Sequence, residues 1–241
     1  VALAQCRDNP HFVPEPFSSE YRRSRYDSMC QLAERTCSLL ELRLNDLPSA
    51  TKPEARRVLD YESRIQARFR ALLDLESSGL RIRCHGDYHL GQVLWTGQNF
   101  MIIDFEGEPA RPLSERRVKH PPILDVVGML RSFHYAPYAV LLDQRSDPHA
   151  EHAVETLELR IRFWYSWVSV EFLKAYLGIA GRASFWPQSR DEVEILLEVH
   201  LLEKAIYELA YELNNRPNWV KIPLRGIIQL LESDPLPRHG E

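Results

Sequence analysis

Glycine is scarce in this sequence, and its spacing excludes one kind of site. The 241 residues contain ten glycines and no Gly-x-Gly anywhere. A loop that cradles nucleotide phosphates with its backbone amides is normally rich in closely spaced glycines. Residues 1–79 have helical patterning, and no strand with a buried lysine precedes His85. We therefore expect that residues 1–241 hold no β-rich nucleotide-binding lobe.

Other scarce features exclude further classes of protein. The four cysteines form no Cys-x-x-Cys pair, which is typical of reduced thiols in a cytoplasmic protein rather than of a disulfide framework. The apolar runs are far shorter than the ~20 residues that span a bilayer, and the N-terminus lacks the features of a signal peptide. A net charge of −4 gives no basic field. We expect a cytoplasmic protein with neither nucleic acid nor membrane as a partner.

The hydrophobic pattern changes twice along the chain. Apolar residues recur at helical spacing in both halves, and a short stretch between them has the alternating or fully apolar pattern of strands. The expected strands are 80–84, 92–95 and 100–103, with a tight turn at 96–99. The expected helices are about 20–47, 54–76, 123–143, 150–180, 190–214 and 223–233. The sequence predicts a mainly α domain with a small three-strand β insert.

The loops of this insert hold the densest polar residues. Asp87 lies in the loop after the first expected strand, where its carboxylate can accept a proton from a hydroxyl group. Gln92 begins the second strand and Asp104 ends the third, and their oxygens suit Mg²⁺. A base beside a magnesium site is what phosphoryl transfer to an alcohol needs. Glu106 could bind the metal or its water molecules. His85 could hold the loop in place or support the metal ligands without binding substrate itself.

Two other interpretations of these residues stay open. His-x-Asp in a loop and a carboxylate after a strand are each common without any catalytic role, so the prediction rests on the joint pattern and its spacing. His85 and His89 also flank Asp87, and the three side chains could bind zinc. Zinc sites with His-x3-His spacing usually need a helix, whereas Gly86 and Gly91 favour a loop.

The longer motifs resemble a known family. His-x-Asp, a ligand five residues after the aspartate and an aspartate after an apolar strand resemble kinases of the aminoglycoside phosphotransferase type. HGDYHLGQVL (85–94), IIDFEGEPARPLSERR (102–117), DVVGMLRSFHYA (125–136) and YELNNRPNW (211–219) are similar to bacterial maltokinases, above all those fused to trehalose synthase. The resemblance covers essentially the whole chain. It implies a protein-kinase-like C-terminal lobe that transfers phosphate from ATP to maltose, with Asp87 as base and Gln92 and Asp104 as Mg²⁺ ligands.

The resemblance also places the sugar on the C-terminal helices. Lys204, Tyr207 and Tyr211 form one helical stripe, and aromatic rings beside charged groups suit a sugar. The same helix has core-facing apolar residues, so packing is the competing explanation. Arg111, Arg116 and Arg117 could bind substrate or support the metal loop, although a solvated charged loop is the default for such a run.

The expected organisation is an arm at 1–18 and a kinase-like lobe at 19–241. Within this lobe, the catalytic insert covers about 80–122 and the sugar-binding helices about 123–233. Without a nucleotide-binding lobe, the isolated chain is expected to have little kinase activity. Two alternatives remain: a kinase for another sugar, such as glucosamine or an aminoglycoside, and a non-catalytic domain that stabilises a trehalose synthase in the same chain or as a partner.

Overall fold

The computed structural model describes residues 1–5, 9–76, 79–109, 112–144 and 151–232. They fall into two compact units. The loop unit comprises Val1–Glu15 and Leu80–Trp186, and the helical unit comprises Pro16–Gly79 and Pro187–Glu241. No helix in the described ranges is both long and apolar enough to cross a membrane. The fold is mainly helical, as the sequence predicts.

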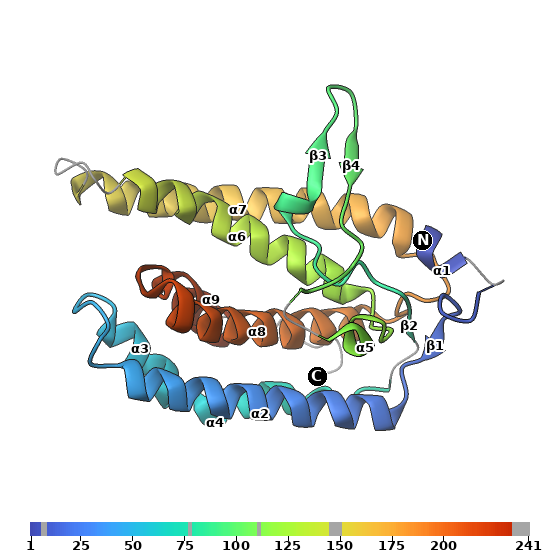
Figure 1. The fold of residues 1–241 in the computed structure, drawn as a ribbon, viewed down its shortest axis with the longest axis horizontal. Helices are drawn as coiled ribbons and strands as arrows, with labels where there is room; N and C mark the ends of the chain where they lie inside the picture. Colours follow the sequence, from blue (N-terminus) through green and yellow to red (C-terminus); the bar gives the residue numbers. More distant parts are fainter. Residues whose placement is uncertain (6–8, 77–78, 110–111, 145–150, 233–241) are drawn as a thin grey trace. The chain divides into compact units, whose positions relative to one another are not determined.

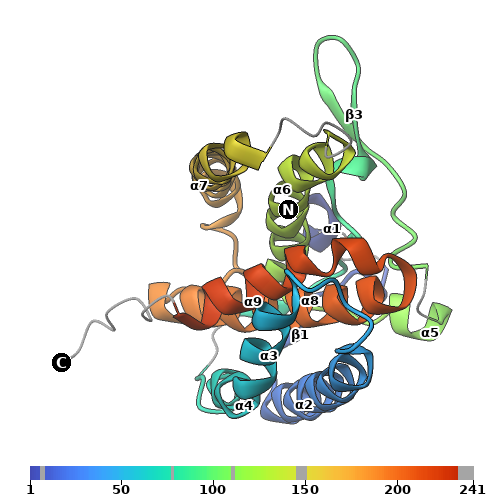
Figure 2. The same cartoon turned by 90° about the vertical axis from the view of Figure 1, so that its left-hand side faces the viewer.

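The helical unit is built around its longest C-terminal helix. Its elements are α2 (Ser19–Arg43), α3 (Lys52–Asp60), α4 (Glu62–Arg70), α8 (Arg190–Asn215), the short turn η2 (Pro217–Trp219) and α9 (Lys221–Glu232). Helix α8 packs against both α2 and α9 (Figure 2). Met29 and Leu40 of α2 are buried, as are Leu202 and Leu209 of α8. Their three- and four-residue spacing gives each helix one apolar face, and these faces form the core.

Serines fix the starts of the two long helices. The Ser18 hydroxyl accepts the Tyr21 N–H at 3.3 Å, and the Ser189 hydroxyl accepts the Glu192 N–H at 3.5 Å. The single helix expected at 54–76 is wrong, because α3 and α4 are separate. The Tyr61 N–H bonds to the Val58 carbonyl at 3.1 Å, which tightens the turn and redirects the chain. Val58 and Ile65 are buried on either side of this break, so one amphipathic pattern serves two helices.

A buried ionic cluster joins α2 to α8. Arg25 of α2 forms an ion pair and hydrogen bond with Glu203 of α8. The Nδ1 atom of His200 lies 3.0 Å from the other Glu203 oxygen. Burial alone would raise the pKa of Glu203, but Arg25 and His200 outweigh it and hold that pKa far below its ordinary value. Glu203 is therefore charged inside the unit.

The loop unit carries the β structure and two long helices. Its elements are α1 (Ala2–Gln5), β1 (Glu15–Pro16) where the units join, β2 (Leu80–Arg81), η1 (Leu90–Gln92), β3 (Val93–Trp95), β4 (Phe100–Ile102), α5 (Leu113–Arg116), α6 (Ile123–Gln144) and α7 (Glu151–Ala180). Strands β3 and β4 form an antiparallel hairpin in which Val93 pairs with Ile102. The hairpin projects from the side of the unit formed by α6 and α7 (Figure 1). Helices α6 and α7 pack together, with the rings of Phe133 and Phe172 edge to face at 5.6 Å.

The three expected strands do not form a single sheet. The structure has two separate two-stranded sheets, β1–β2 and β3–β4. Residues after Leu80 are extended, as their alternation predicts, but their backbone partners lie elsewhere. Ile82 forms a bridge with His120, and the Leu80 N–H bonds to the Phe185 carbonyl. An extended segment takes whichever backbone partners the tertiary structure offers, and alternation alone does not identify them.

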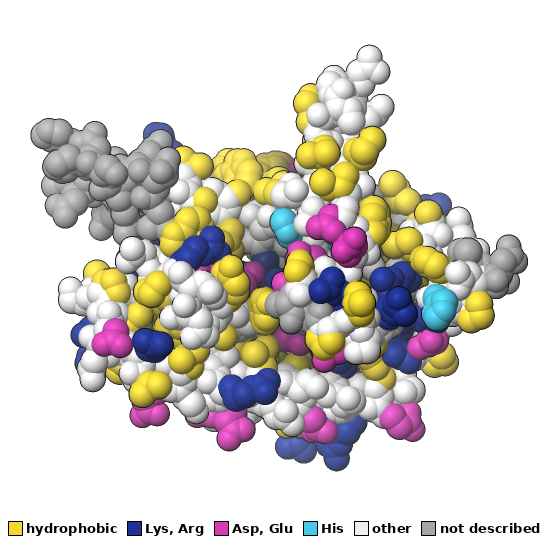
Figure 3. Space-filling model, viewed as in Figure 1, with side chains coloured by type: hydrophobic (Ala, Val, Ile, Leu, Met, Phe, Trp, Pro, Cys, Tyr) yellow, Lys and Arg dark blue, Asp and Glu magenta, His cyan; other side chains and the backbone are white. Residues whose placement is uncertain are grey.

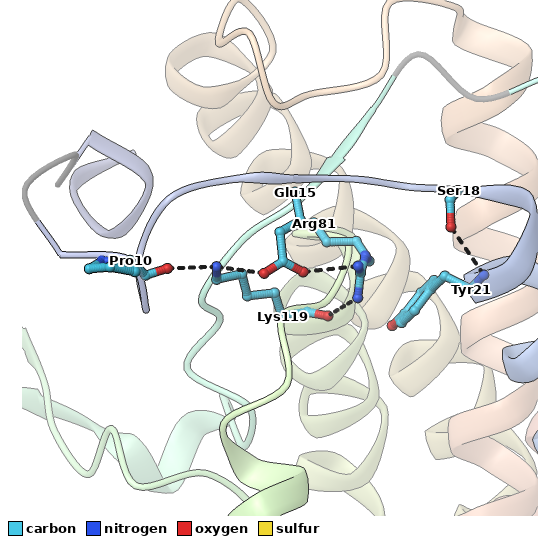
Figure 4. A network of polar contacts seen from close by, with 6 residues as sticks. All are labelled: Pro10, Glu15, Ser18, Tyr21, Arg81 and Lys119. Atoms are coloured by element: carbon cyan, nitrogen blue, oxygen red, sulfur yellow. Dashed lines mark hydrogen bonds and ion pairs between the residues drawn. The ribbon is translucent and has the colours of Figure 1, made fainter.

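Glu15 and Lys119 tie the N-terminal arm to the loop unit. Lys119 Nζ lies 2.7 Å from Glu15 Oε1 and donates to the Pro10 carbonyl at 2.9 Å (Figure 4). The other Glu15 oxygen lies 2.9 Å from Arg81 Nη2 on β2. Lys119 is buried, so its charge is compensated by this ion pair. The segment 9–15 is thus fixed beside the strand that leads to the candidate catalytic loop.

Candidate functional site

A buried carboxylate anchors the loop that carries Asp87. Asp125, in the first turn of α6, accepts the His85 N–H at 2.8 Å on one oxygen and the Gly86 N–H at 3.0 Å on the other. Burial raises the pKa of Asp125, and the two amide hydrogen bonds oppose this rise. Sequence reasoning missed Asp125. Its position in the first turn of an expected helix was visible, but its partners were not.

His85 connects this loop to the end of the hairpin. Its Nε2 atom lies 2.8 Å from the Ile103 carbonyl, and its Nδ1 accepts the Asp87 N–H at 3.4 Å. Accepting at Nδ1 leaves the proton on Nε2, which can then donate to Ile103. The ring is buried beside Phe105, with centroids 4.8 Å apart. These contacts are those of a side chain that holds the loop in place.

Close backbone approaches require glycine at three places around the loop. Gly86 has φ +87° and Gly107 has φ +81°, and a Cβ at Gly86 would lie 3.3 Å from the Gly107 Cα. A Cβ on Gly128 of α6 would lie 2.5 Å from the Tyr88 carbonyl oxygen. Gly86 and Gly107 thus have left-handed backbone conformations, which residues with a side chain adopt only with strain. The loop, the segment after β4 and α6 therefore pack backbone against backbone.

Asp87 lies at the centre of this arrangement and is half-buried. Its side chain is 19% exposed, and its Oδ2 atom lies 3.7 Å from His89 Nε2. The side chain is therefore only partly exposed to solvent. His85 and His89 are the two histidines of the zinc alternative. The Nε2 atom of His85 contacts the Ile103 carbonyl, whereas that of His89 faces Asp87. Within the described residues, no three His, Cys, Asp or Glu side chains gather as a metal site, so that alternative gains no support.

The hairpin brings together the two proposed magnesium ligands. Gln92 Nε2 donates to Asp104 Oδ2 at 3.0 Å, and the Ile103 N–H bonds to the Gln92 carbonyl at 3.0 Å. Asp104 has φ +60°, a left-handed conformation that is strained for a residue with a side chain. Both side chains offer oxygen atoms, the ligand type that Mg²⁺ prefers. One carboxylate and one amide oxygen would fit such an ion.

The charged loop after Asp104 has mixed roles. Glu106 is exposed, and no hydrogen bond ties it to Asp104 in the described part of the chain. Arg116 donates to the Pro109 carbonyl at 2.8 Å and packs beside Gly107, so it supports the loop. Arg117 is exposed. Arg111 lies outside the described residues.

The expected sugar stripe belongs to α8 in the helical unit. Lys204 Nζ lies 4.8 Å from the centre of the Tyr207 ring, and Tyr211 is 47% exposed. Arg216 forms a two-point ion pair with Glu212, at 2.7 and 2.9 Å, and stacks over Trp219 at 4.5 Å. Arg216 also lies 5.4 Å from the Tyr211 ring, so the end of α8 is held by a stack of three side chains.

The hairpin beside the site has exposed apolar side chains. Its exposed residues are Leu94, Trp95, Phe100, Met101 and Ile102. Figure 3 shows hydrophobic side chains along the base of the projecting hairpin, with acidic side chains and a histidine just below them. The Trp95 and Phe100 rings pack on each other at 4.9 Å. The apolar patterning of these strands therefore does not reflect burial within the described residues.

Comparison with known proteins identifies related sequences. The model of the phosphotransferase enzyme family (APH) matches residues 18–154, more than half of the chain. The glucosamine kinase of Streptacidiphilus jiangxiensis is 28% identical over 183 residues, which are 74% of this chain and 38% of that protein. The glucosamine kinase of Mycolicibacterium smegmatis is 27% identical over 151 residues, 61% of this chain and 34% of that protein. The chain thus spans little more than a third of the length of these relatives.

Solved structures show the same likeness. A glucosamine kinase in complex with glucosamine, ADP and inorganic phosphate aligns with 91% of this chain and 46% of its own, with a TM-score of 0.66 and 25% identity. A second crystal form of a glucosamine kinase aligns with a TM-score of 0.64 over 91% of this chain and 48% of its own, at 24% identity, which supports the fold alone. These relatives are named for glucosamine. The comparisons therefore give no support to maltose or to trehalose synthase and favour the alternative acceptor.

Proposed function

Because the chain belongs to the phosphotransferase enzyme family, we propose that it supplies the base and metal ligands of an ATP-dependent sugar kinase. The proposed acceptor is an amino sugar of the glucosamine type. The observation that supports the proposal is the loop anchored by Asp125. This loop carries Asp87, and its His85 contacts the Ile103 carbonyl, one residue before Asp104 of the Gln92–Asp104 pair. The names of the relatives support the choice of acceptor.

The chemistry assigned to Asp87 is proton acceptance. As the acceptor oxygen bonds to the γ-phosphorus of ATP, its O–H bond breaks and the proton moves to the Asp87 carboxylate. The bond between the γ-phosphorus and the β–γ bridging oxygen breaks, and ADP leaves. Half-burial limits the water around Asp87, while its accessible part leaves room for an acceptor. Fixed backbone contacts on both sides of the loop keep the carboxylate in place, so little reorganisation is needed when substrate binds.

Asp104 and Gln92 would hold Mg²⁺ in this proposal. When bound, the ion would neutralise phosphate charge as the γ-phosphoryl group moves. The strained backbone of Asp104 and the hydrogen bond from Gln92 place both side chains on one side of the hairpin end. Turning the Gln92 amide would exchange its nitrogen for its oxygen at the same position, so a cation can replace the present hydrogen bond.

Acceptor contacts on α8 remain part of the proposal. Tyr211 has the exposed ring that stacking on a sugar needs, and Arg216 and Trp219 hold it in place. The ammonium group of an amino sugar favours a carboxylate. Glu208 and Glu212 lie beside the stripe, and Glu212 pairs with Arg216.

An acceptor panel tests the proposed function. The protein, with whatever sequence flanks residues 1–241 in its natural chain, is supplied with ATP, Mg²⁺ and either glucosamine, maltose or an aminoglycoside. We expect ADP release to depend on glucosamine. ADP release that depends only on maltose would instead support maltose as the acceptor. If none of the three sugars stimulates ADP release, the proposal is contradicted. Residues 1–241 alone are expected to release little ADP, because the phosphate-binding glycine loop that such kinases use is not in this sequence.

A further inference from the structure

His89 lies two residues after Asp87, and its ring has a defined hydrogen-bonding state. Its Nδ1 atom accepts the Gly91 N–H at 3.0 Å. A ring nitrogen that accepts a hydrogen bond carries no proton, so the proton of the neutral imidazole is on Nε2. Nε2 is the atom that faces Asp87, 3.7 Å from its Oδ2. The neutral ring therefore directs an N–H group towards the proposed catalytic carboxylate.

Gly91 provides an independent sign that this ring position matters. A Cβ at position 91 would lie 2.7 Å from His89 Cε1 and 3.0 Å from His89 Nδ1. The backbone of Gly91 is not in the left-handed region that favours glycine. A side chain at position 91 would thus displace the His89 ring, because the atoms it would meet belong to that ring.

Neighbouring backbone groups fix the peptide on both sides of the ring. The Leu90 N–H donates to the Ser132 hydroxyl at 3.1 Å, which ties the segment to α6. The Gln92 N–H donates to the His89 carbonyl at 2.9 Å. The ring cannot act as the base in this state, because Nδ1 is engaged by Gly91 and Nε2 already carries a proton.

We propose that His89 is a positioning residue for Asp87, an inference that rests on the proposed function. Its Nε2–H holds one oxygen of the Asp87 carboxylate and so directs the other oxygen to the acceptor hydroxyl. A separation of 3.7 Å exceeds a hydrogen bond, and it closes by less than 1 Å when the acceptor fills the site. Catalytic hydrogen bonds are often long before substrate binds.

A double-mutant cycle on the full natural chain tests this role. His89→Leu removes the donor, His89→Gln restores an N–H at similar reach, and Gly91→Ala displaces the ring without removing it. His11→Leu, at an exposed histidine, is the matched control. We expect His89→Leu to lower kcat by about 10- to 100-fold with little change in KM, and His89→Gln to recover most of the loss. Gly91→Ala should lower kcat in the native background and have no further effect in the His89→Leu background.

The outcomes separate this inference from the proposed function. A His89→Leu enzyme with native kcat contradicts the positioning role, as does a Gly91→Ala loss that persists without the ring. Asp87→Asn, measured alongside, tests the base itself. If Asp87→Asn is inactive while His89→Leu is fully active, the proposed function stands and the His89 inference fails. ¹⁵N-histidine NMR tests the ring without substrate: a proton on Nε2 supports the inference, and a proton on Nδ1 overturns it.

Discussion

Asp125 Oδ2 accepts a 2.8 Å hydrogen bond from the backbone N–H of His85, so a side chain at the start of α6 fixes the beginning of the candidate catalytic loop. Its other oxygen accepts the next amide, that of Gly86. Two successive N–H groups, that of the buried His85 and that of the exposed Gly86, thus depend on one carboxylate. An unsatisfied buried donor costs about 1–3 kcal/mol, so this contact links the stability of the unit to the geometry of its site.

Replacing Asp125 should therefore affect both stability and turnover. We expect Asp125→Ala to lower the free energy of unfolding by about 1–3 kcal/mol, because the N–H of the buried His85 loses its acceptor, whereas the exposed Gly86 N–H can bond to water. We also expect kcat to fall, because the loop shifts. Asp125→Asn keeps one carbonyl acceptor, so its stability and kcat should lie between those of the native protein and of Asp125→Ala. Urea denaturation and steady-state kinetics measure these effects. An Asp125→Ala enzyme with native kcat would show that the conformation of the loop does not depend on Asp125.

Glu203 should make the helical unit sensitive to acid. Its pKa is lowered in the folded state, so its contribution is fully present above the unfolded pKa of about 4.3 and is lost as pH falls through the lower folded pKa. Glu203→Gln should cost about 3–5 kcal/mol at pH 7, because Arg25 is left buried without its charge partner. The difference from the native protein should shrink below about pH 4.

Glu198 on the same helix is the control for this prediction. It pairs with Arg68 at 2.7 Å, but both side chains are partly exposed, at 36% and 23%. Glu198→Gln should cost less than about 1 kcal/mol at any pH. Denaturant unfolding at pH 7, 5 and 3.5 provides the comparison. Equal losses for the two variants, or a Glu203→Gln loss that does not change with pH, would contradict a buried charged pair.

The arm should loosen when its clamp is removed. Lys119→Met removes the ion pair with Glu15 and the hydrogen bond to the Pro10 carbonyl. We expect faster amide hydrogen exchange in residues 9–15, because their contacts to the loop unit depend on this buried ammonium group. Lys174→Met, which breaks an exposed pair with Glu171, should leave exchange in the arm unchanged. Unchanged exchange in Lys119→Met would mean that other contacts hold the arm.

Two thiols should resist alkylation in the folded protein. Burial raises the pKa of Cys37 to about 11 and raises that of Cys84 well above its ordinary value. The thiolate is the reactive form, so both should react slowly at pH 8, whereas the partly exposed Cys30 reacts sooner. Mass spectrometry after timed iodoacetamide treatment identifies the modified sites. Labelling of Cys84 at the rate seen in denaturant would contradict its burial.

The sequence predicts local features of this fold better than distant contacts. The starts of α2 and α8 lie at or within one residue of the expected positions 20 and 190, because helical apolar spacing begins there. The break at Tyr61 was missed, since the apolar pattern continues through it. The partners of the extended residues 80–84 were missed as well, because strand pairing depends on tertiary structure.

The candidate site could also be predicted only in part from the sequence. Motif spacing indicated Asp87, Gln92 and Asp104, and the hairpin does bring the last two into contact, although their catalytic and metal roles remain predictions. Asp125 was missed because it acts through backbone amides about 40 residues earlier in the chain. The maltose assignment finds no support in the comparisons, for a related reason. The shared motifs lie around the phosphoryl-transfer chemistry, whereas acceptor choice depends on residues that these motifs do not determine.

Glucosamine-dependent ADP release by Asp87→Asn in the full natural chain tests the assigned role of Asp87 most directly. Asparagine keeps the size of the side chain and cannot accept the proton. We predict a loss of kcat of at least about 100-fold, with a thermal midpoint within about 2 °C of the native protein. Turnover close to the native rate in a correctly folded Asp87→Asn enzyme would remove Asp87 as the base and contradict the central claim.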